Sequence, residues 1–206
     1  MQKENVIVTL IIAVVSTVIG GIALEWWSKS KPIVLPDDFL DSASVGSPLA
    51  TFEKKLGTCD FANTQVVQLE NGHSVKKYDY TWNFKNATLL ISLYDNDPGI
   101  TELTIVVNNG YSFRTSSQSP FKLGEMTIEA LKNIVGSTNF IDNVSFLEDP
   151  KDSNKCFLIY NEQFPDYNFQ LTSDYFSCSI INEISETTAH DESIYFDEVN
   201  VTKTNY

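Results

Sequence analysis

The stretch YDYTWNF, residues 78–84, alternates aromatic and polar side chains at every position. Successive side chains of a strand point to opposite faces, so this alternation is typical of a strand with one buried and one solvated face. Two further apolar stretches, residues 88–94 and 100–107, follow it and are separated by the turn-forming sequence DNDPG. Together with a shorter apolar stretch at 65–69, they predict an antiparallel meander.

A second set of stretches with the same order lies later in the chain. Residues 156–160, 167–171 and 176–180 carry apolar side chains in strand-like patterns, and a shorter apolar stretch at 144–147 precedes them. The sequence therefore predicts a second antiparallel meander.

A short helix is predicted ahead of each meander. In the first half a Ser-Pro start is followed by three apolar residues with helical spacing and a closing glycine, namely Leu49, Phe52, Leu56 and Gly57. The spacing of the apolar residues and the closing glycine recurs 79 positions later, as Ile128, Leu131, Val135 and Gly136. A helix of about nine residues is unstable alone, so we expect each helix to pack on a sheet.

Residues 6–24 form an uncharged apolar stretch, which is followed by Trp26 and Trp27. At 1.5 Å per residue a helix of this length is about 29 Å long, close to the thickness of the hydrocarbon core of a bilayer. Tryptophans at its end are typical of the membrane interface. The sequence thus predicts a transmembrane helix in contact with membrane lipid.

The fate and orientation of this segment leave alternatives open. A cleaved signal peptide competes with a retained anchor, because Gly21 and Ala23 have the small-residue spacing that signal peptidase requires. The positive charges are balanced, since Lys3 and the α-amino group oppose Lys29 and Lys31. We expect a retained single-pass anchor in the cell inner (plasma) membrane, with the domain on the extracytoplasmic side.

We therefore predict an α+β fold, with an N-terminal transmembrane helix followed by two tandem units of short helix plus antiparallel β-meander. The predicted boundaries are an anchor at 1–27, a tether at 28–44, the first unit at 45–108, a linker at 109–121, the second unit at 122–185, and an acidic tail at 186–206 that could form an edge strand.

The composition excludes several classes of function. The 206 residues include 14 Lys and Arg against 27 Asp and Glu, a net charge of −13, and Arg114 is the one arginine. Nucleic-acid backbones require a basic surface, so no nucleic-acid partner is expected. The three cysteines and two histidines lack metal-ligand spacing, so we predict no metal and no cofactor.

A helix ending in Leu-Gly, then a loop, then aromatic-rich strands resembles the tandem repeat of β-lactamase-inhibitor-like proteins and the single repeat of envelope-assembly lipoproteins of the small-protein-A type. The residues that carry the resemblance are Gly46, Leu49, Phe52, Leu56, Gly57, 78–84 and 124–136. No lipobox cysteine follows the apolar segment, so the lipoprotein anchor is not part of the resemblance. It implies a non-enzymatic protein-binding scaffold and transfers no individual binding residue.

Catalysis would most easily use Cys59 or a serine together with His73 or His190. No flanking signature marks a nucleophile, and we predict that the protein is not an enzyme. A membrane-tethered hydrolase with an unrecognised site is the alternative.

Two further groups of residues have ordinary structural interpretations. Asp95, Asn96, Asp97 and Glu102 offer oxygens to Ca²⁺, but these residue types are also those of a tight turn, which we predict here. Cys156 and Cys178 are predicted on strands separated by a third, about 9–10 Å apart, which is too far for a disulfide. We expect them to be small buried side chains.

The aromatic row Tyr78, Tyr80, Trp82 and Phe84 is the candidate protein-binding surface, because exposed aromatic residues form binding hot spots. The competing interpretation is that this row is the core face under the first helix. We predict a membrane-anchored, non-enzymatic module that binds a protein partner or serves envelope assembly.

Overall fold

The computed structural model describes residues 32–68, 72–117, 122–181, 184 and 194–204. Short helices form at Phe39–Asp41 (η1), Leu49–Leu56 (α2), Ile128–Val135 (α3), Ser137–Asn143 (α4) and Cys178–Ile180 (η2). The strands are Phe61–Gln68 (β1), Ser74–Asn83 (β2), Ala87–Tyr94 (β3), Glu102–Val107 (β4), Phe113–Arg114 (β5), Lys122–Leu123 (β6), Val144–Asp149 (β7), Asp152–Gln163 (β8), Tyr167–Ser173 (β9), Phe176–Ser177 (β10) and Phe196–Lys203 (β11).

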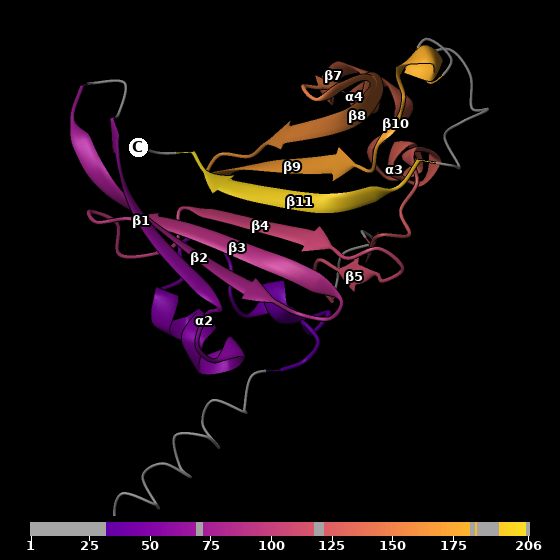
Figure 1. Cartoon of the computed structure of the whole chain (residues 1–206). Helices are drawn as coiled ribbons and strands as arrows, with labels where there is room; N and C mark the ends of the chain where they lie inside the picture. The colour runs from indigo at the N-terminus through magenta and orange to yellow at the C-terminus, as the bar shows by residue number, and fades with distance from the viewer. Residues whose placement is uncertain (1–31, 69–71, 118–121, 182–183, 185–193, 205–206) are drawn as a thin grey trace, which may run out of the picture.

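Nine of these strands form one antiparallel sheet, in the order β1-β2-β3-β4-β11-β9-β8, with β7 and β10 both paired to β8. The last strand in sequence, β11, pairs with β4 on one side and with β9 on the other. Figure 1 shows this yellow strand between the two halves of the sheet. The short strands β5 and β6 pair with each other.

The cross-strand register gives the sheet one covered and one open face. A row of directly opposed side chains on the covered face is fully buried: Trp82, Leu89, Ile105, Val199, Leu171 and Tyr160. The adjacent row points the other way and none of its side chains is buried: Thr81, Leu90, Thr104, Asn200, Gln170 and Asn161. Alternation along the strands therefore separates the core from a polar open face.

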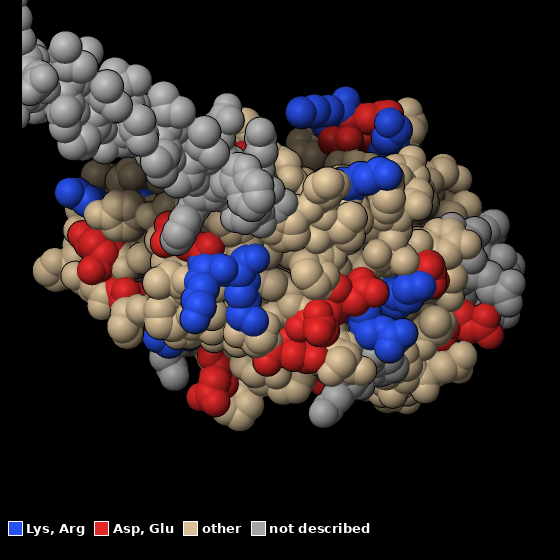
Figure 2. Space-filling model, turned by 90° about the horizontal axis from the view of Figure 1, so that it is seen from below, with Lys and Arg blue, Asp and Glu red and all other residues tan. Residues whose placement is uncertain are grey.

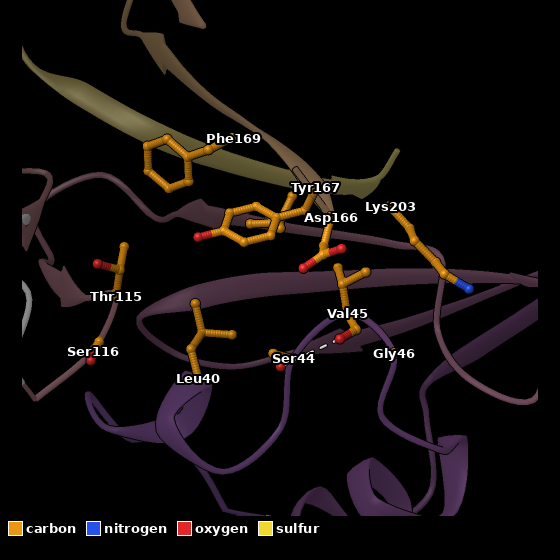
Figure 3. A pocket seen from close by; sticks show the side chains of 11 residues that line it. Leu40, Ser44, Val45, Gly46, Thr115, Ser116, Asp166, Tyr167, Phe169 and Lys203 are labelled. Carbon is orange, nitrogen blue, oxygen red and sulfur yellow. Dashed lines mark hydrogen bonds between the residues drawn. The ribbon is translucent and has the colours of Figure 1, made fainter. Parts of the chain in front are cut away.

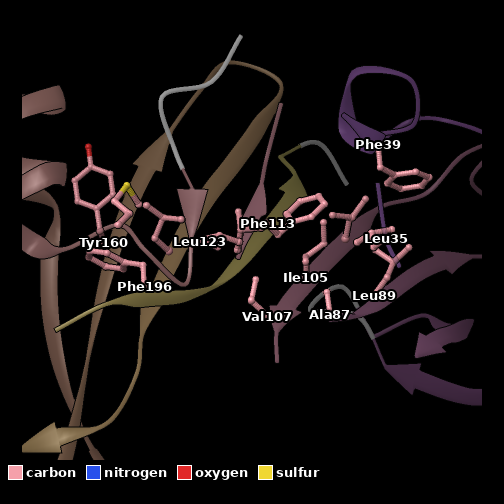
Figure 4. Packing of buried hydrophobic residues seen from close by; sticks show 14 of the residues in the cluster. Leu35, Phe39, Ala87, Leu89, Ile105, Val107, Phe113, Leu123, Tyr160 and Phe196 are labelled. Carbon is pink, nitrogen blue, oxygen red and sulfur yellow. The ribbon is translucent and has the colours of Figure 1, made fainter. Parts of the chain in front are cut away.

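The core lies between the covered face and the helices. Phe52 of α2 and Phe140 of α4 are both buried, and the Trp82 indole N–H donates to the Gly57 carbonyl at 2.9 Å, where α2 ends. Burying one large apolar side chain such as Phe52 contributes about 1.5–3 kcal/mol to the stability of the fold. One cluster of buried residues spans the molecule, which Figure 4 follows through Tyr160, Phe196, Phe113, Ile105, Leu35 and Phe39.

The segment ahead of α2 is part of this core, although a tether is predicted for residues 28–44. Leu35, Phe39 and Ala43 are almost completely buried. Asn86, a buried residue of the β2–β3 turn, accepts a hydrogen bond from the Leu35 N–H at 2.8 Å and donates to the Leu35 carbonyl at 2.9 Å. These two hydrogen bonds of the Asn86 side chain satisfy two buried backbone groups and hold the segment against the sheet.

The predicted fold class, an α+β chain with a transmembrane helix and two tandem helix-plus-meander units, is wrong. The described chain is mainly antiparallel sheet with short helices, and nine of its strands form one sheet rather than one meander per unit. The reason is β11, which belongs to the predicted acidic tail yet inserts between β4 and β9 instead of lying at an edge. Alternation shows which face a residue occupies but not which strand lies beside it.

The transmembrane and single-pass predictions are corrected as well. Among the described helices, none is both long and apolar enough to cross a membrane. Residues 6–24, on which those predictions rested, lie outside the described residues.

Cys156 and Cys178 form a disulfide, with Cα atoms 5.0 Å apart, so the prediction that a strand separates them is wrong. The strand β9 ends at Ser173, and β10 then pairs with β8 directly, with Phe176 opposite Cys156. This change of partner brings Cys178 within bridging distance. Cys59 is the cysteine of the described chain that takes part in no disulfide.

Replacing Asn86 with Ala should lower the free energy of unfolding by about 2–3 kcal/mol, because two backbone groups of Leu35 lose their partners in a buried place. Urea denaturation measures the change. The control Asn109→Ala removes an amide from an exposed position and should cost under about 0.5 kcal/mol. Equal effects of the two variants would contradict the role given to Asn86.

The double variant Cys156→Ala/Cys178→Ala should lose about 3 kcal/mol of stability, because the bridge closes a loop with a sequence separation of 22. Thermal denaturation measures the loss, and Cys59→Ala, a change at a half-buried cysteine outside the disulfide, is the comparison. Thiol titration of the unfolded, unreduced protein should find one reactive thiol, and finding three would contradict the disulfide.

Candidate functional site

A groove of about 570 Å³ opens beside the end of β11. Its lining comes from four segments that are distant in sequence, within residues 40–46, 115–116, 166–169 and 201–203. Figure 3 shows the Tyr167 hydroxyl pointing into the space between Phe169, Thr115 and Leu40. Side chains from both halves of the chain thus surround this groove.

The first wall of the groove is the N-terminal segment around η1, which is bound to the chain that follows β5. The Asp41 carboxylate accepts hydrogen bonds from the Ser116 hydroxyl and, at 3.0 Å, from the Ser117 N–H. These bonds, the Ser116 hydroxyl first, lower the pKa of Asp41. Residues 115 and 116 belong to the predicted linker 109–121, but this contact makes them part of the wall.

Two glycines set the position of the other end of this wall. The Gly46 N–H donates to the Ile100 carbonyl at 2.7 Å, and the Ile100 N–H donates to the Ser47 carbonyl at 2.9 Å. A Cβ atom on Gly99 would lie 2.2 Å from the Gly46 carbonyl oxygen. Any side chain at position 99 would therefore displace the wall.

The opposite wall consists of the adjoining ends of β9 and β11. Val201 lies opposite Phe169, and Lys203 lies opposite Tyr167. The Tyr167 ring stacks on Phe164, with ring centroids 4.7 Å apart, which holds its hydroxyl over the groove.

The groove combines an apolar interior with one uncompensated charge. Leu40, Val45, Phe169, Val201 and the Tyr167 ring supply the apolar surface. The Lys203 ammonium lies 3.1 Å from the Asp97 carboxylate and is thereby compensated. Within the described part of the chain, no basic side chain pairs with Asp166 at the rim. Such an arrangement is chemically suited to an apolar group that has a basic group beside it.

A second cavity, of about 220 Å³, lies near the start of β11 and is lined by Asp174 and Asp197. Burial first, and then the negative charge of Asp174, raise the pKa of Asp197 from 3.8 to about 6. No group of three or more potential metal ligands occurs among the residues that the structure describes. Burial and the neighbouring carboxylate thus both favour the protonated form of Asp197.

The predicted aromatic row occupies two different environments. Trp82 and Phe84 are buried in the core. Tyr78 and Tyr80 are half-buried on the covered face of β2, and solvent reaches both. None of the four lines the groove. Partner binding by this row stays a prediction, with Tyr78 and Tyr80 as the two accessible members.

The structure does not bring the candidate catalytic residues together. Cys59 precedes β1, and His73 lies exposed in the connection between β1 and β2. The eight residues of β1 extend between them, a distance of about 26 Å at 3.3 Å per residue. His190 lies outside the described residues.

Of the candidate Ca²⁺ residues, Asp95, Asn96 and Asp97 occupy the β3–β4 connection, where the Asp97 N–H donates to the Tyr94 carbonyl at 3.0 Å in a turn, and Glu102 begins β4. Two of the carboxylates pair with lysines instead of converging: Asp97 with Lys203 at 3.1 Å, and Glu102 with Lys77 at 3.0 Å.

The groove is not predicted from the sequence, because its lining comes from five separate predicted segments: the tether, the first unit, the linker, the second unit and the tail. The one local signal is the sequence Phe164-Pro165-Asp166-Tyr167, in which a turn is followed by an exposed aromatic residue. Nothing local indicates that residues 40–46 lie opposite this turn.

The charges on the surface are distributed in small groups. In the face shown in Figure 2, acidic and basic side chains alternate in patches rather than forming one continuous acidic area. The excess of acidic residues therefore does not define a binding surface on this face.

No family model and no curated protein matches the chain. Among solved structures, a cysteine-rich secretory protein of Staphylococcus aureus is similar at 12% identity, with a TM-score of 0.45. The match covers 84% of this chain and 50% of that one, so the chain spans about half the length of that protein. At this level the similarity assigns neither a family nor a function. The resemblance to β-lactamase-inhibitor-like proteins stays a prediction.

The acid pair predicts a specific dependence of stability on pH. Because the pKa of Asp197 is raised on folding, the folded state holds the proton more tightly, and stability is lost as the pH rises from about 4 to about 6. Asp197→Asn should therefore raise the melting temperature at pH 7.5 by a few degrees, about 1 kcal/mol after allowance for solvent screening, and should give no gain at pH 4.

Scanning calorimetry at the two pH values measures this difference. Asp174→Asn, which removes the neighbouring charge, should give a smaller gain in the same direction. A gain from Asp197→Asn that is equal at pH 4 and pH 7.5 would contradict the assignment.

Proposed function

We propose that the protein is a non-enzymatic protein-binding module, and that the groove receives an extended segment of the partner. The segment carries a large apolar side chain next to a lysine or arginine. The observation that carries the proposal is the apolar groove with the Asp166 carboxylate at its rim, which pairs with no basic side chain among the residues that the structure describes.

The dimensions and the lining of the groove support this occupant. A volume of about 570 Å³ lies in the range typical of binding sites, and its interior offers carbon surface on several sides. An apolar side chain that enters the groove is removed from water. This contributes about 25 cal/mol of favourable free energy per Å² of apolar surface buried. The Tyr167 hydroxyl is placed to form a hydrogen bond with the backbone of the segment.

Charge complementarity favours a basic neighbour in the segment. The whole chain carries a net charge of −13, and Asp166 adds a local negative charge at the entrance of the groove. Opposite charges accelerate association and fix the register of a bound segment.

The alternative of a hydrolase has less support from the geometry. Ser44 and Ser116 line the groove, but no histidine is among its described lining residues. The Ser116 hydroxyl already donates to Asp41 as part of the wall.

The disulfide supports a location outside the cytoplasm, because disulfides persist in oxidising compartments. An extracytoplasmic domain is therefore part of the proposal.

Selection of a phage-displayed library of random linear peptides on the immobilised full chain tests the function. Enriched peptides should combine an aromatic or large aliphatic residue with an adjacent basic residue. Val45→Glu, which places a charge in the apolar interior, should weaken their binding at least about tenfold by fluorescence polarisation. Asp166→Asn should weaken it less and should reduce its salt dependence.

The matched control is Leu147→Glu, the same type of change at an exposed apolar residue on the distant strand β7. It should change the affinity less than twofold. The proposal fails if no motif is enriched, or if the peptides bind Val45→Glu as tightly as the unchanged protein.

A further inference from the structure

The strand β1 forms an open edge of the sheet, and the described chain places no strand on its outer side. Its eight residues, FANTQVVQ, include no charged residue, no proline and no glycine, and all except Val67 are exposed. Natural edge strands are protected by charges, prolines, bulges or short length, because their free backbone groups accept another strand. Along β1 the pairing with β2 is regular, so none of these protections is present.

The edge on the other side of the sheet, β7, shows the contrast. This strand has six residues, ends in Glu148 and Asp149, and has an irregular register with β8 at those two residues. It therefore has both charge and a break in pairing. Within one sheet, one edge is protected and the other is open.

The chemical character of β1 is symmetric about Thr64. Its two neighbours, Asn63 and Gln65, carry amide side chains, and the next two residues on each side are apolar. A twofold axis perpendicular to the sheet relates two antiparallel strands and keeps equivalent faces on the same side, so residues of the same parity stand opposite each other. With the axis at Thr64, like then meets like in each pair: Phe61 with Val67, Ala62 with Val66, and Asn63 with Gln65.

We propose that β1 pairs with β1 of a second copy of this chain, antiparallel and with Thr64 opposite Thr64. The two nine-stranded sheets then continue as one. Phe61 and Val66, which are 68% and 69% exposed, each gain an apolar neighbour across the new pair. The absence of charge on β1 permits this contact even though each chain carries a net charge of −13.

The proposal does not depend on the groove, and a charge exchange at Thr64 tests it. Sedimentation velocity of the full chain, in a mild non-ionic detergent because residues 6–24 are apolar, should show a dimer in the micromolar range. Thr64→Lys and Thr64→Asp each place two like charges about 5 Å apart across the pair. Each variant alone should dissociate at least about tenfold more readily, and an equimolar mixture of the two should recover the dimer.

The control Ser145→Lys introduces the same charge at an exposed position of the protected edge β7 and should leave the dimer unchanged. Thr64 is exposed, so melting curves of its variants at low concentration should match that of the unchanged monomer. The proposal is overturned if the unchanged chain is monomeric up to about 100 µM, if Thr64→Lys associates as tightly as the unchanged chain, or if the mixture associates no better than either variant alone.

Discussion

The pairing of β11 with both β4 and β9 holds the two halves of the chain in one sheet. Val199 is fully buried between Ile105 and Leu171, and without β11 the strands on either side would present open edges. The Asn200 amide also donates to the Thr104 hydroxyl at 2.9 Å across 96 residues of sequence. The contacts that close so long a loop must offset a large loss of chain entropy, and the buried row across all central strands supplies them.

The groove is a consequence of this closure. One wall comes from the N-terminal segment that Asn86 holds on the first half, and the other comes from the ends of β9 and β11. Because β11 sets the spacing between the two halves of the chain, it also sets the width of the groove. The same closure leaves one face of the sheet polar and uncovered, and leaves β1 and β7 as its outer strands.

The sequence predicts local structure well in this protein. The alternation in residues 78–84 correctly distinguishes the buried Trp82 from the partly exposed Thr81, and Gly57 and Gly136 end their helices with positive φ. These features depend on neighbours within a few residues, which a local pattern contains. The prolines and charges of residues 28–44 are typical of a tether, but Leu35 and Phe39 are buried there because of a contact with Asn86, 51 residues from Leu35.

The pairing of distant segments is what the sequence does not reveal. Two residues of β10 replace β9 beside β8, and this small change decides the disulfide. The position of β11 decides the sheet, and the groove depends on both the tether segment and β11. Each of these features is a choice of neighbour, which alternation and spacing leave undetermined.

Hydrogen exchange of the β11 amides tests the central position of this strand most directly. If β11 is an interior strand, the amides of Val199 to Val201 exchange as slowly as those of Leu89 to Ile91 in β3, and both groups follow global unfolding as denaturant is added. Rapid exchange in β11 while β3 stays protected would show that the two halves do not depend on it, and would contradict this account.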